Sequence, residues 1–302
     1  AGLAKATLGA KFNGAPAVVD LRTPVPNGTK IEIITSKSPE GLEVIRHTAA
    51  HVMAQAVQAI WPDVKVTIGP VVENGFYYDF DMAPLTREDL KKKKKEMKKV
   101  IKENPPIERY ELPREEAIAY MKEKDEPYKV ELIEDLPEDA TISFYKQGDF
   151  TDLCAGPHLM SVKPIKAFKL TASSGAYWRG NENNKMLTRI YGTAYTKKAD
   201  LEERLKYLEE IKLRDHNRLG REMELFTTVD VIGQGLPLLL PKGAKIIQTL
   251  QRWIEDLEDN EWGYVRTKTP LMAKSDLYKI SGHWDHYKEG MFVLGDEEND
   301  KE

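Results

Sequence analysis

A helical repeat of apolar residues constrains the fold more than any other feature of the sequence. Apolar side chains recur every three or four positions between residues 41 and 60, at Ile45, Ala49, Val52, Ala56 and Ile60. Before this repeat, Ser38 and Pro39 form a typical N-cap and first-turn pair. The segment is therefore predicted to be a long helix that packs one face against a core.

Two histidines lie on a different face of this predicted helix. His47 and His51 are four residues apart, so both imidazoles can address one atom or one group of a substrate. Further along the chain, Cys154 and His158 repeat this spacing around the turn signal Ala-Gly-Pro, and Cys154 is the only cysteine of the sequence. We predict that the two pairs form one cluster.

Three interpretations of this cluster are open from the residues alone. Three histidines and a thiolate match the ligands that zinc prefers, and four groups complete a tetrahedral site. The same groups can instead orient a water molecule and move its proton near neutral pH, without a metal. In the third interpretation the histidines of the helix are exposed and the cysteine is a buried structural residue.

Composition narrows the class of protein. The chain has 302 residues, of which 41% are apolar, and this suggests roughly two domains with real cores. Its 45 basic and 49 acidic residues nearly cancel, so contact with RNA must rely on local patches. One cysteine and no signal-peptide pattern favour the cytoplasm. The apolar runs are too short to span a membrane, so no membrane role is expected.

The remaining segments predict a mixture of small sheets and helices. Residues 11–36 alternate β-rich runs with turns and predict an incomplete sheet module. Residues 87–104 predict a lysine-rich helix, whose lysines are better explained as a solvated face than as an RNA-binding patch. Further elements are expected as strands within 64–82 and 167–195, a charged helix over 197–220, a long helix over 242–260, and a strand ending at Pro270. Both ends look cut, which indicates a piece of a longer protein.

The segments HTAAH, GFYYDF, DLCAGPH and GAYWRGNENNKMLTRIYGTAY resemble the editing domain of the bacterial threonyl-tRNA synthetase family. The resemblance covers essentially the whole chain and implies an α+β fold in four parts. These are a partial β-grasp (TGS) module in 1–37, a mixed sheet-and-helix editing domain in 38–195, a linker helix in 196–220, and in 221–302 the start of the class II antiparallel-sheet core, including motif 1.

The resemblance also implies the site. His47, His51, Cys154 and His158 take the positions that line the editing pocket, and Lys129 and Asp152 match further basic and acidic residues, expected at the rim of an open cleft. Tyr78 matches a pocket tyrosine, with Tyr77 beside it as the alternative. Alanyl-tRNA synthetases share this layout and often hold zinc, but the threonyl family is thought to edit without a metal, so none is expected in this pocket.

The resemblance implies that the parent protein joins threonine to its tRNA with ATP, and that this portion removes serine mischarged on that tRNA. ATP, magnesium and a catalytic zinc are expected to serve the parent only, because their binding motifs would lie beyond residue 302. The parent is expected to be a homodimer through the motif 1 region. The alternative is a non-catalytic RNA-binding or regulatory module with an editing-domain fold.

Overall fold

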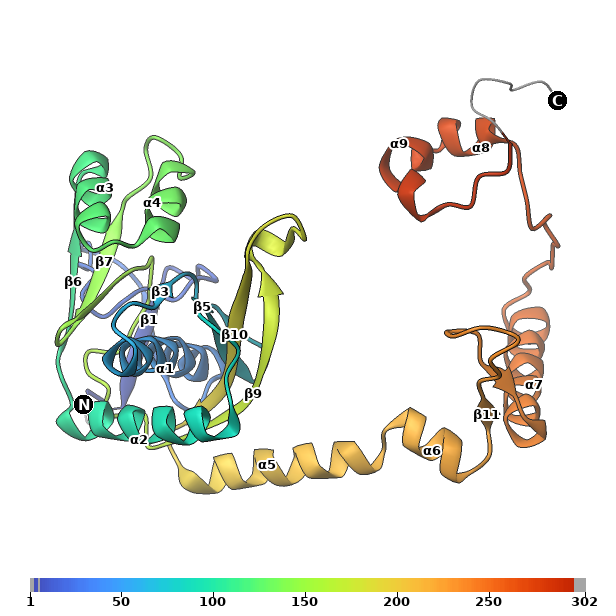
Figure 1. The fold of residues 1–302 in the computed structure, drawn as a ribbon, viewed down its shortest axis with the longest axis horizontal. Coiled ribbons are helices and arrows are strands. Elements are labelled where there is room, and N and C mark those ends of the chain that lie inside the picture. Colours follow the sequence, from blue (N-terminus) through green and yellow to red (C-terminus); the bar gives the residue numbers. More distant parts are fainter. Residues whose placement is uncertain (1–2, 5, 296–302) are drawn as a thin grey trace. The chain divides into compact units, whose positions relative to one another are not determined.

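A computed structural model describes residues 3–4 and 6–295, whose contacts divide the chain into two compact units, residues 1–212 and residues 213–302. Each unit combines helices with small antiparallel sheets, which confirms the α+β class (Figure 1). Among the residues that the structure describes, no helix has both the length and the apolar character needed to cross a membrane.

Helix α1 (Pro39–Ile60) is the central element of the first unit. It begins as predicted, because the Ser38 hydroxyl accepts a hydrogen bond from the Gly41 amide and proline occupies the first turn. The predicted stripe is buried from Ile45 to Ala56, while Ile60 at its end is half-buried, and Ile45 is fully inaccessible. The other faces are buried as well, because the five-stranded sheet and helix α2 (Arg87–Glu103) also contact α1. Burial of α1 therefore extends beyond the predicted stripe.

The first unit contains three antiparallel sheets. The five-stranded sheet has the order β3-β5-β10-β9, with β4 paired to β5. Its strands are β3 (Lys65–Val66), β4 (Val71–Val72), β5 (Gly75–Asp81), β9 (Ala167–Tyr177) and β10 (Met186–Tyr195). A three-stranded sheet contains β6 (Ile107–Glu111), β7 (Ser143–Gln147) and β8 (Phe150–Leu153), and a two-stranded sheet pairs β1 (Thr7–Phe12) with β2 (Ile31–Thr35). The predicted pairing of two strands within 167–195 is confirmed.

Short helices complete the first unit, and a long one leads out of it. Helices α3 (Arg114–Glu123) and α4 (Pro127–Glu134) pack on each other beside the three-stranded sheet (Figure 1). The charged helix predicted over 197–220 forms as two helices, α5 (Lys198–Leu213) and α6 (His216–Glu222). The chain breaks there because Asp215 caps α6, its side chain accepting the Arg218 amide at 3.0 Å.

The second unit contains little sheet. Helix α7 (Pro241–Asp256), extended by a π-helical turn Leu257–Glu261, confirms the long helix predicted over 242–260. Besides α6, its other elements are β11 (Phe226–Thr227), β12 (Leu238–Leu239), α8 (Ser275–Ile280), α9 (His283–Tyr287) and a 3₁₀ turn (Lys288–Gly290). The strand predicted to end at Pro270 is not formed. A strand needs a hydrogen-bonded neighbour, and no segment in the described part of the chain pairs with residues 263–270.

One lysine of α2 departs from the predicted solvated face. Lys93 is 0% exposed, and its Nζ lies 4.8 Å from the ring centroid of Trp61 and 5.9 Å from that of Phe80. Among the described residues, this amine has no hydrogen-bond partner. Burial lowers the pKa of Lys93 to about 7, with only Asp89 acting in the opposite direction.

Replacing Lys93 with methionine is expected to stabilise the chain by about 1–3 kcal/mol at pH 7, because it removes an unpaired buried polar group. The folded wild type binds fewer protons than the unfolded chain between about pH 7 and pH 10.5, so its stability should rise across this range. Lys93→Met should lose that rise. Urea unfolding followed by circular dichroism at several pH values tests both effects.

The exposed Lys95 provides the matched control, since Lys95→Met changes a side chain of the same helix that water already solvates. That substitution should alter the free energy of unfolding by less than about 0.5 kcal/mol. A Lys93→Met chain that is less stable than the wild type would contradict the assignment of Lys93 as an unfavourable buried amine.

Candidate active site

The structure brings the two predicted pairs together. His47 and His51 lie on α1, while Cys154 and His158 lie on the loop that follows β8, and one nitrogen or sulfur atom of each lies within 4.8 Å of the others. The Cys154 Sγ atom is 3.3 Å from His47 Nε2 and 3.2 Å from His158 Nε2. His51 is 3% exposed and His47 is half-buried, so the interpretation in which both helix histidines are exposed does not fit.

Hydrogen bonds fix the tautomers of two imidazoles. His47 Nδ1 lies 3.2 Å from the Pro157 carbonyl, which can only accept, so Nδ1 carries the proton. His158 Nδ1 lies 3.3 Å from the hydroxyl of Thr48, which already donates its proton to a carbonyl of α1 and therefore accepts here. Both Nε2 atoms are left with lone pairs that face Cys154. A lone pair of this kind can take a proton from a water molecule.

A buried charge pair lies next to the histidines. Lys129 Nζ is 2.5 Å from Asp152 Oδ1, and the Tyr78 hydroxyl donates to Asp152 Oδ2 at 2.6 Å. His51 Nε2 lies 3.4 Å from the same Oδ2 atom. Burial raises the pKa of Asp152, but Lys129 and His51 together outweigh burial and hold this pKa below its ordinary value.

The position of this pair corrects one expectation. Lys129 and Asp152 were expected at the rim of an open cleft, but each residue is only 2% exposed. Burial of two ionised side chains is tolerated here because each compensates the charge of the other and Tyr78 satisfies a further oxygen. Lys129 and Asp152 therefore form part of the enclosed interior of the site.

Burial also sets the protonation of the other site residues. Loss of water lowers the pKa of His51 to about 3, that of His158 well below its ordinary value, and that of His47 in the same direction. The three imidazoles are therefore neutral at pH 7. Burial, assisted by the charge of Asp152, raises the pKa of Cys154 to about 12. The sulfur is a thiol, which makes it a poor nucleophile.

Tyr77 does not join the cluster. Successive side chains of a strand point to opposite faces of the sheet, and Tyr78 takes the face toward the site. On the other face, the Arg189 guanidinium lies 3.8 Å from the centroid of the Tyr77 ring, and the Tyr191 ring lies 5.8 Å away. Of the two adjacent tyrosines, only Tyr78 contacts the other site residues.

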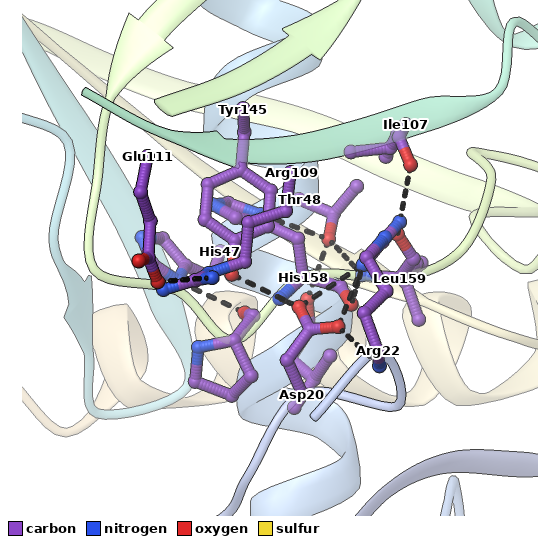
Figure 2. Close-up of polar contacts among 12 residues, drawn as sticks. Asp20, Arg22, His47, Thr48, Ile107, Arg109, Glu111, Tyr145, His158 and Leu159 are labelled. Carbon is purple, nitrogen blue, oxygen red and sulfur yellow. Dashed lines mark hydrogen bonds and ion pairs between the residues drawn. The ribbon is translucent and has the colours of Figure 1, made fainter. Parts of the chain in front are cut away.

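Two residues that sequence reasoning missed, Asp20 and Arg22, hold the loop at His158 (Figure 2). Asp20 Oδ2 accepts hydrogen bonds from the His158 amide at 3.1 Å and from the Tyr145 hydroxyl at 3.0 Å. Arg22 pairs with Asp20 at 2.8 Å and donates to the Leu159 carbonyl at 2.9 Å. A segment before α1 therefore fixes the backbone of a site histidine.

The turn between Cys154 and His158 requires a glycine. Gly156 has a φ of +77°, and a Cβ atom there would lie 2.1 Å from the Tyr145 hydroxyl oxygen. Both the left-handed conformation and the close contact exclude larger residues. The turn signal that the sequence showed is thus part of the packing around His158.

The donor atoms of the cluster are of the types that zinc binds. These atoms lie up to 4.8 Å apart, which exceeds the roughly 3.3–3.8 Å between ligand atoms in a tetrahedron with zinc bonds of about 2.0–2.3 Å. To hold zinc, the four residues would have to move slightly closer together, and Cys154 would have to lose its proton as its sulfur bound the ion. Without such an ion, hydrogen bonds already orient His47 and His158.

Comparison with known proteins assigns the family. The family described as threonyl and alanyl tRNA synthetase second additional domain matches residues 142–191, which include Asp152, Cys154 and His158. The threonine–tRNA ligase of Clostridium botulinum (strain Alaska E43 / Type E3) is 63% identical over 302 residues, covering 100% of this chain and 46% of that protein. This chain belongs to the threonyl-tRNA synthetase family.

Further threonyl-tRNA synthetase relatives match in the same way. The threonine–tRNA ligase of Clostridium perfringens (strain 13 / Type A) is 63% identical over 302 residues, which are 100% of this chain and 46% of that protein. The threonine–tRNA ligase of Acetivibrio thermocellus is 52% identical over 301 residues, 99% of this chain and 47% of that protein. The chain spans about half the length of the curated relatives that it matches.

Cys154 is expected to resist alkylation in the folded chain. With its pKa raised to about 12 from 9.0, the thiolate is about a thousandfold scarcer at pH 8 than for an ordinary cysteine. Iodoacetamide should therefore modify the folded chain far more slowly than the chain unfolded in urea. Because Cys154 is the only cysteine, intact mass reports the reaction directly. Equal rates in the two states would show that the thiol is neither buried nor neutral.

Proposed function

We propose that this chain carries the editing site of a threonyl-tRNA synthetase and hydrolyses the ester that joins serine to the tRNA. The observation that supports this most strongly is the pair of imidazole lone pairs, on His47 and His158, that converge beside the buried Lys129–Asp152 pair. The match of residues 142–191 to the second additional domain of threonyl and alanyl tRNA synthetases favours the same function.

The need for such a site follows from the substrates. Serine lacks one methyl group of threonine, and a missing group of this size changes binding by only about 1–3 kcal/mol. An aminoacylation site that binds threonine therefore also accepts some serine. A second site that hydrolyses the wrong ester corrects this error, provided that it excludes the larger amino acid.

Ester hydrolysis needs an activated water, a stabilised oxyanion and a proton for the leaving ribose hydroxyl. In our proposal, Nε2 of His47 or His158 takes the proton of the attacking water and later returns it to the ribose oxygen. The Lys129 amine stabilises negative charge on the former carbonyl oxygen, and Asp152 holds that amine. Cys154, as a neutral thiol between the two rings, forms a wall against the additional methyl group of threonine.

For the parent protein we propose the properties implied by its family. It would join threonine to tRNA with ATP and magnesium, use a catalytic zinc, form a homodimer through the motif 1 region around α7, and work in the cytoplasm. The division into 1–37, 38–195, 196–220 and 221–302 belongs to this proposal. Relatives named threonine–tRNA ligases support it, while residues 1–302 alone are not expected to ligate threonine.

The central test uses serine-charged threonine tRNA and the purified 302-residue chain. His47→Ala should slow serine release by about 10²–10⁴-fold, because a positioned proton-transfer group contributes that much. It should cost little stability, since His47 lies outside the apolar stripe and is not fully buried. Measurements of serine release and of urea unfolding separate the two effects.

Ile45→Ala is the contrasting variant on the same helix. Ile45 is fully buried, so its truncation should cost about 2–5 kcal/mol in free energy of unfolding. If His47→Ala unfolds the domain while the remaining folded protein still releases serine normally, His47 is structural. A wild-type chain that binds the charged tRNA and leaves the ester intact would favour a non-catalytic RNA-binding module.

Editing is expected to proceed without a metal. A chelator should leave serine release unchanged, because hydrogen bonds to Pro157 and Thr48 already orient the two bases. Added zinc should inhibit, because it would compete for the Nε2 lone pairs that water needs. Cys154→Ala should weaken this inhibition by removing one ligand. Loss of activity on chelation, restored by zinc, would instead establish a metal site.

A further inference from the structure

The helix that carries Lys129 has little stability of its own. Helix α4 has only eight residues, and the side chain of its N-cap residue, Glu126, makes no capping hydrogen bond. Isolated helices shorter than about 12–15 residues are marginal in water, so neighbouring elements must hold α4 in place. The position of the Lys129 amine therefore depends on the contacts of α4.

The end of the β9–β10 hairpin contacts α4. We call the 3₁₀ turn Trp178–Gly180 the hairpin tip. Trp178, which is 6% exposed, donates its indole N–H to Glu131 at 3.1 Å, and its ring lies 5.1 Å from that of Tyr128 in an edge-to-face arrangement. Arg179 forms ion pairs with Glu131, at 2.9 Å, and with Asp135. Two successive tip residues thus hold three residues of α4 or its C-cap.

The backbone of the tip is shaped for these contacts. Arg179 has a φ of +56°, and Gly180, next to it, has a φ of +70°. A residue other than glycine stays in the left-handed region only where its surroundings determine it. A second connection joins the same elements, because Asp81 accepts hydrogen bonds from the Tyr128 hydroxyl at 2.8 Å and from Lys185 of the hairpin at 2.7 Å.

We propose that Trp178 and Arg179 are positioning residues for the Lys129 amine. They contact α4 at residues 128 and 131, on both sides of Lys129 in the sequence, while the amine itself reaches Asp152 at 2.5 Å inside the site. Misplacement of a reacting group by about 1 Å can cost about a hundredfold in rate. This inference rests on the proposed role of Lys129 in serine release.

The test combines a rate with a measure of α4 that does not depend on activity. Trp178→Phe keeps an aromatic ring but removes the indole donor, and Arg179→Ala removes both ion pairs from a side chain that is 40% exposed. Each should slow single-turnover serine release about tenfold or more, leave the affinity for tRNA unchanged, and raise hydrogen exchange of the backbone amides of residues 127–134. Glu182→Gln, an exposed change in the same hairpin, should alter none of these.

A double substitution identifies the route of the effect. In a Lys129→Met background the tip substitutions should cause no further loss of rate, because they act through the missing amine. The same fold loss in both backgrounds would overturn the inference, and so would tip variants with unchanged rate and unchanged exchange. If the wild type does not release serine, the proposed function fails. Increased hydrogen exchange of the amides of residues 127–134 in the tip variants would still support the inference that the hairpin tip keeps α4 in place.

Discussion

The ion pair between Lys129 and Asp152 is the interaction on which the rest of the site depends. Two charges removed from water are tolerated only if they lie close together with good geometry, and loss of one partner from such a pair typically costs about 3–5 kcal/mol. Here the partners come from α4 and β8, and Tyr78 of β5 completes the set. Three elements that are far apart in sequence must therefore meet correctly before any chemistry is possible.

The same enclosure determines the state of the histidines. Exclusion of water disfavours the charged imidazolium, which is why the pKa values of His47, His51 and His158 all fall. A neutral imidazole is a base that is ready to accept a proton at pH 7. The enclosed site thus combines one strong ionic interaction with three uncharged bases, an arrangement that a water-filled cleft would not maintain.

The sequence predicted what depends on local pattern. The limits of α1, the spacing of the two pairs and the pairing of β9 with β10 follow from periodicity, caps and turn residues. Partners distant in sequence were missed, as with Asp20, which accepts a hydrogen bond from an amide 138 positions away. Lys93 was predicted to be exposed to solvent, because the lysines of such a run usually are. In the structure its amine lies near the rings of Trp61 and Phe80. The strand expected before Pro270 shows the same limit, since pairing is not a local property.

In helix α1, the polar face of an amphipathic helix lines the candidate site. Its apolar stripe indicated the core, and His47 and His51 were predicted to lie on a different face. In the structure that face is also covered, and three of its polar groups find partners on the segment around Cys154: His47 on the Pro157 carbonyl, His51 on Asp152, and Thr48 on His158. A buried polar group without a partner is costly, so neither segment could be enclosed without the other. Hydrogen bonds that satisfy buried polar groups therefore hold the HxxxH pair against the CxxxH pair. The same packing brings the Nε2 atoms of His47 and His158 close to the Cys154 sulfur.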